Sequence, residues 1–485
     1  MSERAAQRPN ILLITTDQQR GDGLSLAGHP VLETPHMDFL GQSGTFFRRG
    51  YSECPICVPA RRTLMSGQSP ATHGVLTNHS QAWDPAHTLA GDLRGAGYQT
   101  YMVGKLHLHP SRKRFGFDHL VLANSPRGRD NDYVDWLAGF GALAPVDRWS
   151  MAHGATPNGY IGRPFHLDES LTHTFWCASE AIAFLSKRDR TVPFFLNVSF
   201  YDPHPPQVPP AFCFERYDRM QLPPPVVGDW APDVPGPTHG EDPEAVKGTA
   251  LVHLDDRQIH RWRAAYYGAI TYVDYQVGRL VQYMRESGLL DETFILFTSD
   301  HGEMLRDHHM IGKTRALEGS AHVPFLCRPP KGWGYPSRQV VDAPVGLQDA
   351  MPTLLDAAGL PVPDSCTGRS VLPLMRGESP SAAAWRDVLH GEHSGRYPQH
   401  GGMHYLTDGH SKYVWYSQTG DELLFDLDED PQERHNLTAS GAAGRLATWR
   451  RRLVEALRER PEGFVEGNAL VPGRPHGPTV LGPYR

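Results

Sequence analysis

Near its start the chain reads NILLITT over residues 10–16 and continues directly into Asp17 and Gln18. A short run of this apolar character is typical of a strand that is buried on both faces. Strands of this kind occur in parallel sheets that helices cover on both sides. A carboxylate directly after such a strand lies where open α/β sheets bind ligands, so Asp17 is a candidate metal ligand. A turn or helix-cap aspartate explains this residue equally well on its own.

Three further runs repeat this pattern, at residues 98–103, 192–200 and 293–298. Each continues into side chains that can bind an anion or a metal. In chain order these are Lys105 and His107, then His204, then Asp300 and His301. Because the carboxyl ends of parallel strands share one edge of a sheet, we expect these groups to converge with Asp17. The sequence therefore predicts an α/β fold with a large, mixed, mostly parallel sheet between layers of helices.

The stretch CVPARRTLMSGQ, residues 57–68, lies between the first two of these strands. Pro59 suits the first turn of a helix, where its missing N–H costs nothing. Cys57 would then lie at a helix N-terminus, where free N–H groups favour anions. Arg61 and Arg62 add positive charge and forked donors that match sulfate or phosphate oxygens. This stretch predicts an oxyanion site with a reactive side chain in its floor.

The rest of the chain suggests how it is divided. The apolar spacing over residues 263–289 predicts a long amphipathic helix. Residues 110–190 lack clean periodicity, and we expect substrate-facing loops there. Residues 375–384 have the composition of a linker. Alternation at 412–416 and 422–427, followed by a helix at 443–460, predicts a small C-terminal antiparallel sheet with a helix.

We therefore expect a catalytic α/β domain over residues 1–375 and a small subdomain over 385–460. Residues 461–485 are rich in Gly and Pro and would form an extended tail. Such a tail is either disordered or an arm across a neighbouring subunit, which would make the protein a homo-oligomer.

Composition limits the classes of partner. The 485 residues are 39% hydrophobic and 21% charged, with a net charge of −7, so we expect neither nucleic acid nor a membrane surface as partner. No apolar stretch approaches the length of a membrane span or a secretory signal, which predicts a cytoplasmic protein. The six cysteines are scattered and do not suggest a disulfide framework.

The motif Cys-x-Pro-x-Arg from Cys57 to Arg61, followed by Met65, Ser66 and Gly67, resembles the signature of type I sulfatases in the alkaline phosphatase superfamily. The resemblance implies an arylsulfatase-like sulfuric ester hydrolase. It also implies that a formylglycine-generating enzyme oxidises Cys57 to formylglycine (3-oxoalanine), whose hydrated aldehyde is the nucleophile on sulfate monoesters. Most members have Ser where this chain has Ala60, and the Ala form also occurs among relatives.

The same resemblance implies a site for one divalent metal. Its protein ligands would be Asp17, Gln18, Asp300 and His301, together with the formylglycine at position 57. Calcium is the usual ion of the family, whereas a glutamine and an imidazole nitrogen favour a transition metal such as manganese. These two ligands also resemble those of choline sulfatases and phosphonate monoester hydrolases.

Further roles follow from matching segments of the family. Arg61 and the metal would orient the attacking hydroxyl. His204, with Lys313, would protonate or neutralise the leaving oxygen. His107 would take the proton that expels sulfate. The sulfate oxygens themselves would be held by Lys105, Lys313, His204 and Asn78.

Three alternatives stay open at the level of sequence. The first is a hydrolase of the same superfamily that acts on phosphonate monoesters or phosphodiesters. The second is a non-catalytic, anion-binding relative in which Cys57 remains a thiol. The third is a thiol–disulfide oxidoreductase, because Cys54 and Cys57 have C-x-x-C spacing.

Overall fold

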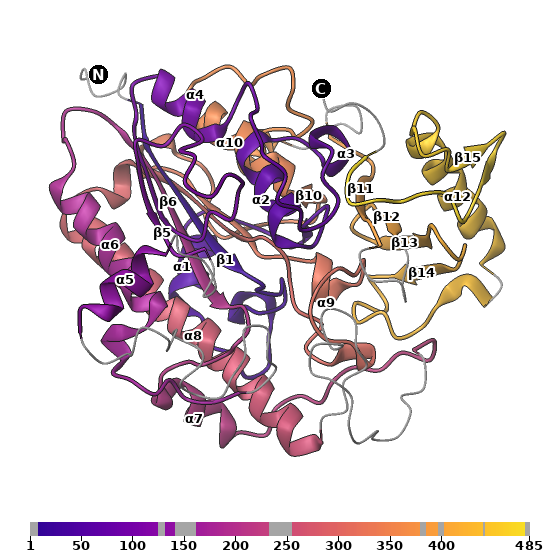
Figure 1. Cartoon of the computed structure of the whole chain (residues 1–485), viewed down its shortest axis with the longest axis horizontal. Helices are drawn as coiled ribbons and strands as arrows, with labels where there is room; N and C mark the ends of the chain where they lie inside the picture. Colours follow the sequence, from indigo (N-terminus) through magenta and orange to yellow (C-terminus); the bar gives the residue numbers. More distant parts are fainter. Residues whose placement is uncertain are drawn as a thin grey trace.

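The computed structural model describes residues 8–124, 131–140, 162–231, 255–378, 385–395, 402–439 and 442–480. Its centre is a sheet of eight strands in the order β5-β4-β6-β1-β7-β8-β2-β9, which Figure 1 shows between helices. The strands of this sheet are β1 Asn10–Asp17, β2 Thr45–Phe47, β4 Gln99–Gly104, β5 His119–Leu122, β6 Phe194–Pro203, β7 Thr293–Ser299, β8 Phe325–Arg328 and β9 Gln339–Val341.

The four strands expected from the sequence lie side by side and run parallel. β1 pairs with β6 on one side and with β7 on the other, and β4 pairs with β6. β8 runs antiparallel to β7 and to β2, so the sheet is mixed but mostly parallel. The predicted fold class is therefore confirmed.

Strand β1 is buried along its whole length, as its composition predicts. Ile11 and Leu13 belong to one apolar cluster and Leu12 and Ile14 to another, because successive side chains of a strand point to opposite faces. The first cluster takes in α2 Cys57–Ser66, α4 Leu89–Gly95 and α10 Ala350–Ala357. The second takes in α1 Pro35–Gln42, α5 Asp132–Ala138, α6 His173–Lys187 and α8 Asp256–Glu286.

Two helices depart from the expectations. Helix α8 begins at Asp256 rather than near residue 263, because Asp255 and Gln258 form a capping box at its start. It ends at Glu286, two residues before Gly288, which has a positive φ. The region 110–190, expected as loops, contains α5 and the fifteen-residue α6, which Thr172 caps. Residues 125–130 and 141–161 of that region lie outside the described residues.

The C-terminal unit has the predicted antiparallel sheet and helix. Its sheet has four strands in the order β11-β12-β13-β14, of which the sequence predicted the last two. They are β11 Leu389–His393, β12 Met403–Thr407, β13 Ser411–Tyr416 and β14 Glu422–Asp426. Helix α12, Ala443–Leu457, packs on one face through an apolar cluster that includes Trp415, Trp449 and Leu453. The other face packs against the catalytic part through Tyr405, Val414 and Phe425.

Residues 461–480 do not leave the molecule as a free tail or as an arm towards a neighbour. They form the hairpin of β15 Val465–Glu466 and β16 Ala469–Leu470, and Thr479 then makes a β-bridge to Val75. Buried Phe464 anchors the segment on the small sheet. Part of the predicted linker, residues 379–384, and the final residues 481–485 lie outside the described residues. The proposed domain boundaries stay predictions.

The remaining elements are short. They are β3 Gly50–Tyr51 and β10 Val345–Gly346, which pair with each other, and the helices α3 Pro70–His73, α7 Ala211–Asp218, α9 Glu318–Ala321 and α11 Leu372–Met375. None of the helices in the described ranges combines the length and the apolar character that crossing a bilayer requires.

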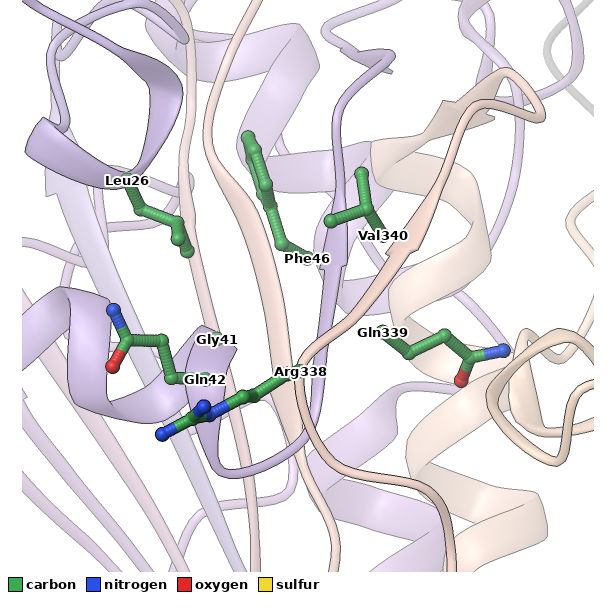
Figure 2. A pocket seen from close by; sticks show the side chains of 7 residues that line it. All are labelled: Leu26, Gly41, Gln42, Phe46, Arg338, Gln339 and Val340. Carbon is green, nitrogen blue, oxygen red and sulfur yellow. The ribbon is translucent and has the colours of Figure 1, made fainter.

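A cavity of about 400 Å³ opens at the β9 edge of the large sheet. Figure 2 shows the residues around it, among them Gln42 of α1, Phe46 of β2 and Val340 of β9. Strand β9 lies at the far edge from β4, and none of the predicted site residues lines this cavity. It is therefore separate from the site described next.

Candidate active site

Cys57 is the first residue of α2 and is 1% exposed. Pro59 lies in the first turn and Gly67 ends the helix in the left-handed conformation, as the sequence indicates. The side-chain oxygen of Asn78 accepts a hydrogen bond from the backbone N–H of Val58 at 2.9 Å. Asn78 thus caps the helix beside Cys57. Its contact with a sulfate oxygen stays a prediction.

Four of the predicted ligands, including Cys57 itself, lie close together. One ligand atom each from Asp17, Cys57, Asp300 and His301 lies within 4.8 Å of the others, and all four residues are buried. His301 Nε2 is 3.3 Å from Cys57 Sγ, 3.5 Å from Asp17 Oδ1 and 3.4 Å from Asp300 Oδ1. The strands explain this meeting, because Asp17 ends β1 and Asp300 follows β7, its parallel neighbour.

The imidazole of His301 is oriented for ligation. Its Nδ1 lies 3.0 Å from the carbonyl oxygen of Gly302. An N–H at Nδ1 that donates to this carbonyl leaves the lone pair on Nε2, which faces the two carboxylates. A hydrogen bond of this kind is the usual means by which proteins fix a metal-binding histidine.

Gln18 is held by a residue that sequence reasoning did not include in the site. The Gln18 amide nitrogen donates to Glu303 Oε2, and Glu303 Oε1 accepts from the backbone N–H groups of Leu305, at 3.0 Å, and Gly312. Because the amide nitrogen is engaged, the amide oxygen faces the other way, 3.0 Å from Lys313 Nζ. The only signal in the sequence for this positioning role is that Glu303 lies close to Asp300, in the stretch after β7.

The two arginines of α2 diverge. Arg61 donates to Asp300 Oδ2 at 2.9 Å and to Ser199 Oγ at 2.9 Å, and it lies 3.5 Å from Asp17 Oδ2. Arg62 instead donates to the carbonyl of Gln81 at 2.6 Å, with its guanidinium over the ring of Trp83. Arg61 belongs to the site as predicted, whereas these contacts of Arg62 are structural.

Lys105 reaches the site because of the turn at Gly104. Gly104 has φ of +96°, and a Cβ there would be 2.0 Å from the carbonyl oxygen of Ser199. From this turn Lys105 pairs with Asp17, and its Nζ is 3.8 Å from Cys57 Sγ. Lys313 approaches from another direction, with Nζ 3.2 Å from Cys57 Sγ.

Both predicted histidines face Cys57. The Cys57 side chain acts on both imidazoles in the direction that raises their pKa. Burial, then Lys313, lowers the pKa of His204 to about 4, and its Nδ1 lies 2.7 Å from the carbonyl oxygen of Pro205. Burial, then Lys105, also lowers the pKa of His107, whose buried Nδ1 makes no hydrogen bond within the described parts of the chain.

The charges around Cys57 determine its acidity. Burial alone would raise the pKa of its thiol, but Lys105, Lys313 and His301 together hold this pKa well below its usual value. Burial opposes charge on Lys313 too, yet Cys57, Asp17 and Asp300 raise its pKa. Cationic groups thus surround the Cys57 position, as binding of an anionic substrate requires.

The residues fit a divalent cation. Asp17 and Asp300 offer carboxylate oxygens, Gln18 an amide oxygen and His301 a nitrogen with its lone pair directed inward. Burial and then Asp17 raise the pKa of Asp300, which shows that two carboxylates packed this closely favour an added positive charge.

Comparison with known proteins agrees with this geometry. Residues 9–360 match the family model "Sulfatase", and residues 306–460 match "N-sulphoglucosamine sulphohydrolase, C-terminal". The chain is 36% identical to an arylsulfatase of Clostridium perfringens, across 96% of this chain and 98% of the relative. It is 28% identical to a choline-sulfatase of Rhizobium meliloti, across 89% and 82% respectively. The crystal structure of a phosphonate monoester hydrolase of Agrobacterium radiobacter superposes with a TM-score of 0.78 at 27% identity, covering 96% of this chain and all of that one.

Proposed function

The chain belongs to the sulfatase family and is a sulfuric ester hydrolase, and on this premise we propose that it cleaves sulfate monoesters with a formylglycine made from Cys57. The observation that carries the proposal is the place of Cys57. It starts α2, its Sγ is 3.2 Å from Lys313 Nζ, and it shares a buried ligand cluster with Asp17, Asp300 and His301.

In this proposal Asp17, Gln18, Asp300 and His301 hold one divalent cation. When bound, the cation and the formylglycine supply charge neutralisation and a hydroxyl nucleophile for attack on sulfur. The imidazole of His301 supports manganese, while the oxygen donors accept calcium equally well. Arg61 keeps both carboxylates in position through its contacts with Asp300 and Asp17.

The remaining groups bind the ester and move protons. Lys105 and Lys313 bring positive charge to the sulfate oxygens. Asn78 lies at the start of the Cys57 helix. Lys313 neutralises charge on the leaving oxygen, and His204 donates a proton to it. The negative charge of a bound sulfate raises the low pKa of His204, which allows the imidazole to carry that proton. His107, with Nδ1 buried and unpaired, accepts the proton that accompanies sulfate release.

Mass spectrometry tests the nucleophile directly. We expect the tryptic peptide Gly50–Arg61 from active protein, made with a formylglycine-generating enzyme, to have lost its thiol sulfur at Cys57 and gained an aldehyde. The Cys57→Ala variant should fold normally and lose activity by several orders of magnitude. A fully active preparation whose peptide carries only the thiol would contradict the proposal.

A second candidate activity is hydrolysis of phosphonate monoesters or phosphodiesters. The observation in its favour is the ligand pair Gln18 and His301, which the sequence resemblance associates with such hydrolases. Rates on matched nitrophenyl sulfate, phenylphosphonate and phosphodiester substrates rank the two activities. We expect the sulfate ester to have the highest kcat/KM, and a higher value for phenylphosphonate would reverse the ranking.

A further inference from the structure

A second group of metal-ligating side chains lies in the C-terminal unit. Glu392 is on β11, His404 is on β12, and His476 comes from the segment after β16. One ligand atom of each lies within 4.8 Å of the others. Their side chains are at most 2% exposed, so this is an interior cluster rather than a surface group of polar residues.

Two nitrogens of this cluster lack a partner among the residues that the structure describes. His404 Nε2 and His476 Nε2 are buried, and neither makes a hydrogen bond to any of those residues. An unsatisfied polar atom in the interior destabilises the folded state, so two of them in one cluster need an explanation. Glu392 does not satisfy these nitrogens by a hydrogen bond. Its Oε2 is 4.0 Å from His476 Nε2, which is too far for one.

The other nitrogen of each ring shows how the unpaired one is oriented. His476 Nδ1 is 2.8 Å from Ser417 Oγ, and the Ser417 hydroxyl donates to the carbonyl of Gly402 at 2.8 Å. Because that hydroxyl proton is engaged, the hydrogen between the two residues is on His476 Nδ1, and Nε2 carries a lone pair. His404 Nδ1 lies 3.2 Å from His390 Nε2 and 3.9 Å from Glu392 Oε2, so an N–H at Nδ1 that donates to His390 leaves the lone pair of His404 on Nε2.

Shape and charge also suit a cation. Gly402 makes room for the His476 ring, since a Cβ at Gly402 would be 1.7 Å from Nδ1. Arg460 Nη1 donates to both oxygens of Glu392 at 2.8 Å, and Arg460 also pairs with Glu462. The carboxylate of Glu392 is thus held in a fixed orientation by Arg460, with its side chain buried beside the two imidazoles.

We propose that Glu392, His404 and His476 bind a second divalent cation of the zinc class, which has a structural role. Two imidazole nitrogens and one carboxylate oxygen are a donor set that zinc accepts, with a fourth position for water. Bonds of about 2.0–2.2 Å in a tetrahedral site place the donors about 3.3–3.6 Å apart. His476 Nε2 and Glu392 Oε2, now 4.0 Å apart, would therefore move closer together. Ser417 and His390 would fix the two rings from behind.

Such an ion would join the C-terminal segment to the active-site region. Just beyond His476, the carbonyl of Pro478 accepts from the N–H of Leu76, and the N–H of Val480 donates to the carbonyl of Gly74. Directly after β11, the N–H of Ser394 donates to the carbonyl of Leu76. Both halves of the proposed site therefore support the segment that leads to Asn78, the cap of the Cys57 helix.

The test uses the full chain with the first metal site removed, as Asp17→Asn/Cys57→Ala/Asp300→Asn. After chelation and dialysis against ZnSO₄, elemental analysis should find one zinc per chain in this background. Adding His404→Ala or His476→Ala should reduce that value to near zero. Adding His410→Ala, an exposed histidine paired with Asp428, should leave it at one.

Two further measurements distinguish loss of the metal site from misfolding of a variant. Co²⁺ added to the unaltered background should give the visible absorption of a four-coordinate site. Ser417→Ala keeps all three ligands and should weaken zinc binding by tenfold or more. No zinc and no cobalt spectrum in the background would overturn the proposal. One zinc that persists in folded His404→Ala and His476→Ala would also overturn it.

Discussion

Cys54 and Cys57 are three residues apart, and their thiols have opposite acidities. Burial, then Glu392 and Glu53, raises the pKa of Cys54 well above its usual value, while lysines surround Cys57 and lower its pKa. Cys54 Sγ faces the carbonyl of Leu76 at 3.5 Å. A pair that exchanges disulfides needs at least one accessible thiol, and both of these are buried. The geometry therefore favours a hydrolase over the C-x-x-C oxidoreductase.

At His204 we predict a dependence on the leaving group. The His204→Ala variant should lose about 10²-fold or more in kcat on alkyl sulfates, whose alkoxides need a proton. The loss on nitrophenyl sulfate should be much smaller, because nitrophenolate leaves without one. Parallel kcat measurements on the two esters check this, with Lys313→Ala as the comparison. Equal losses on both esters would show that His204 does not serve the leaving oxygen.

Glu303 should act through Gln18. The carboxylate of Glu303 can only accept hydrogen bonds, whereas the amide in Glu303→Gln can also donate them. The orientation of the Gln18 amide is then no longer fixed. We expect the activating metal to bind 10- to 100-fold more weakly, the usual effect of removing a residue that orients a ligand. Saturating metal should restore most of kcat, and titration of activity against metal concentration measures both quantities. A lost kcat with unchanged metal affinity would argue for a direct role of Glu303 in the reaction.

Among the elements, the turn after β4 shows how the backbone positions a catalytic side chain. Gly104→Ala would place a methyl group 2.0 Å from the Ser199 carbonyl at a φ of +96°, so the turn that carries Lys105 must move. We expect a loss of stability above 2 kcal/mol and a large rise in KM. Gly97→Ala is the matched control, with φ of +92° and open space around its Cβ. It should cost about 1 kcal/mol in stability and leave the kinetics unchanged.

Helices α1 and α8 are joined by a buried carboxylate. Asp274 accepts from the backbone N–H groups of His36 at 3.0 Å and Met37 at 2.7 Å, at the start of α1. Burial raises the pKa of Asp274 to about 7 from 3.8. Because the folded-state value is the higher one, the stabilisation is complete below pH 3.8 and is lost as the pH rises through 7.

Asp274→Asn keeps the acceptor oxygen and removes this titration. Its unfolding free energy, relative to the unaltered protein, should rise by about 4 kcal/mol between pH 4 and pH 9. Urea unfolding at each pH measures the difference. Asp256→Asn, at the exposed start of the same helix, is the control. A difference that does not change with pH would mean that Asp274 is ionised at little cost.

At the scale of the whole molecule, a buried ion cluster joins the two units. Lys412 of β13 is 2.5 Å from Glu318 of α9 and 3.1 Å from Glu433, and its side chain is fully buried. Glu433 also accepts from the backbone N–H of Glu318 at 2.7 Å. The cluster orients the small sheet against the part of the chain that carries Lys313.

Lys412→Met should therefore destabilise the protein by about 3–5 kcal/mol, because it leaves the buried carboxylate of Glu433 without its cation, beside the carboxylate of Glu318. Adding Glu433→Gln should recover part of this loss. Lys331→Met is the control, since its pair with Asp291 is exposed, and it should change stability by less than about 1 kcal/mol. Denaturant unfolding of the full chain checks all three. A Lys412→Met protein as stable as the control would mean that the cluster contributes nothing.

Much of the fold could be predicted from local pattern. Four apolar runs ending in Asp17, Lys105, His204 and Asp300 predicted the parallel sheet and its functional edge, because burial on both faces leaves a distinctive composition. The start of the Cys57 helix followed from Pro59 and Gly67 in the same way. Helix α6 and strands β11 and β12 were missed, because tertiary packing rather than periodicity stabilises them.

What the sequence by itself determined is the chemistry available at the edge of the sheet, since each of those residues ends its strand or directly follows it. Only the tertiary structure separated Arg61 from Arg62, placed Glu303 behind Gln18 and returned residues 461–480 to the residues before Asn78. These outcomes depend on side-chain direction and on contacts between distant segments. Periodicity along the chain records which face of an element is buried, but not which segment covers it.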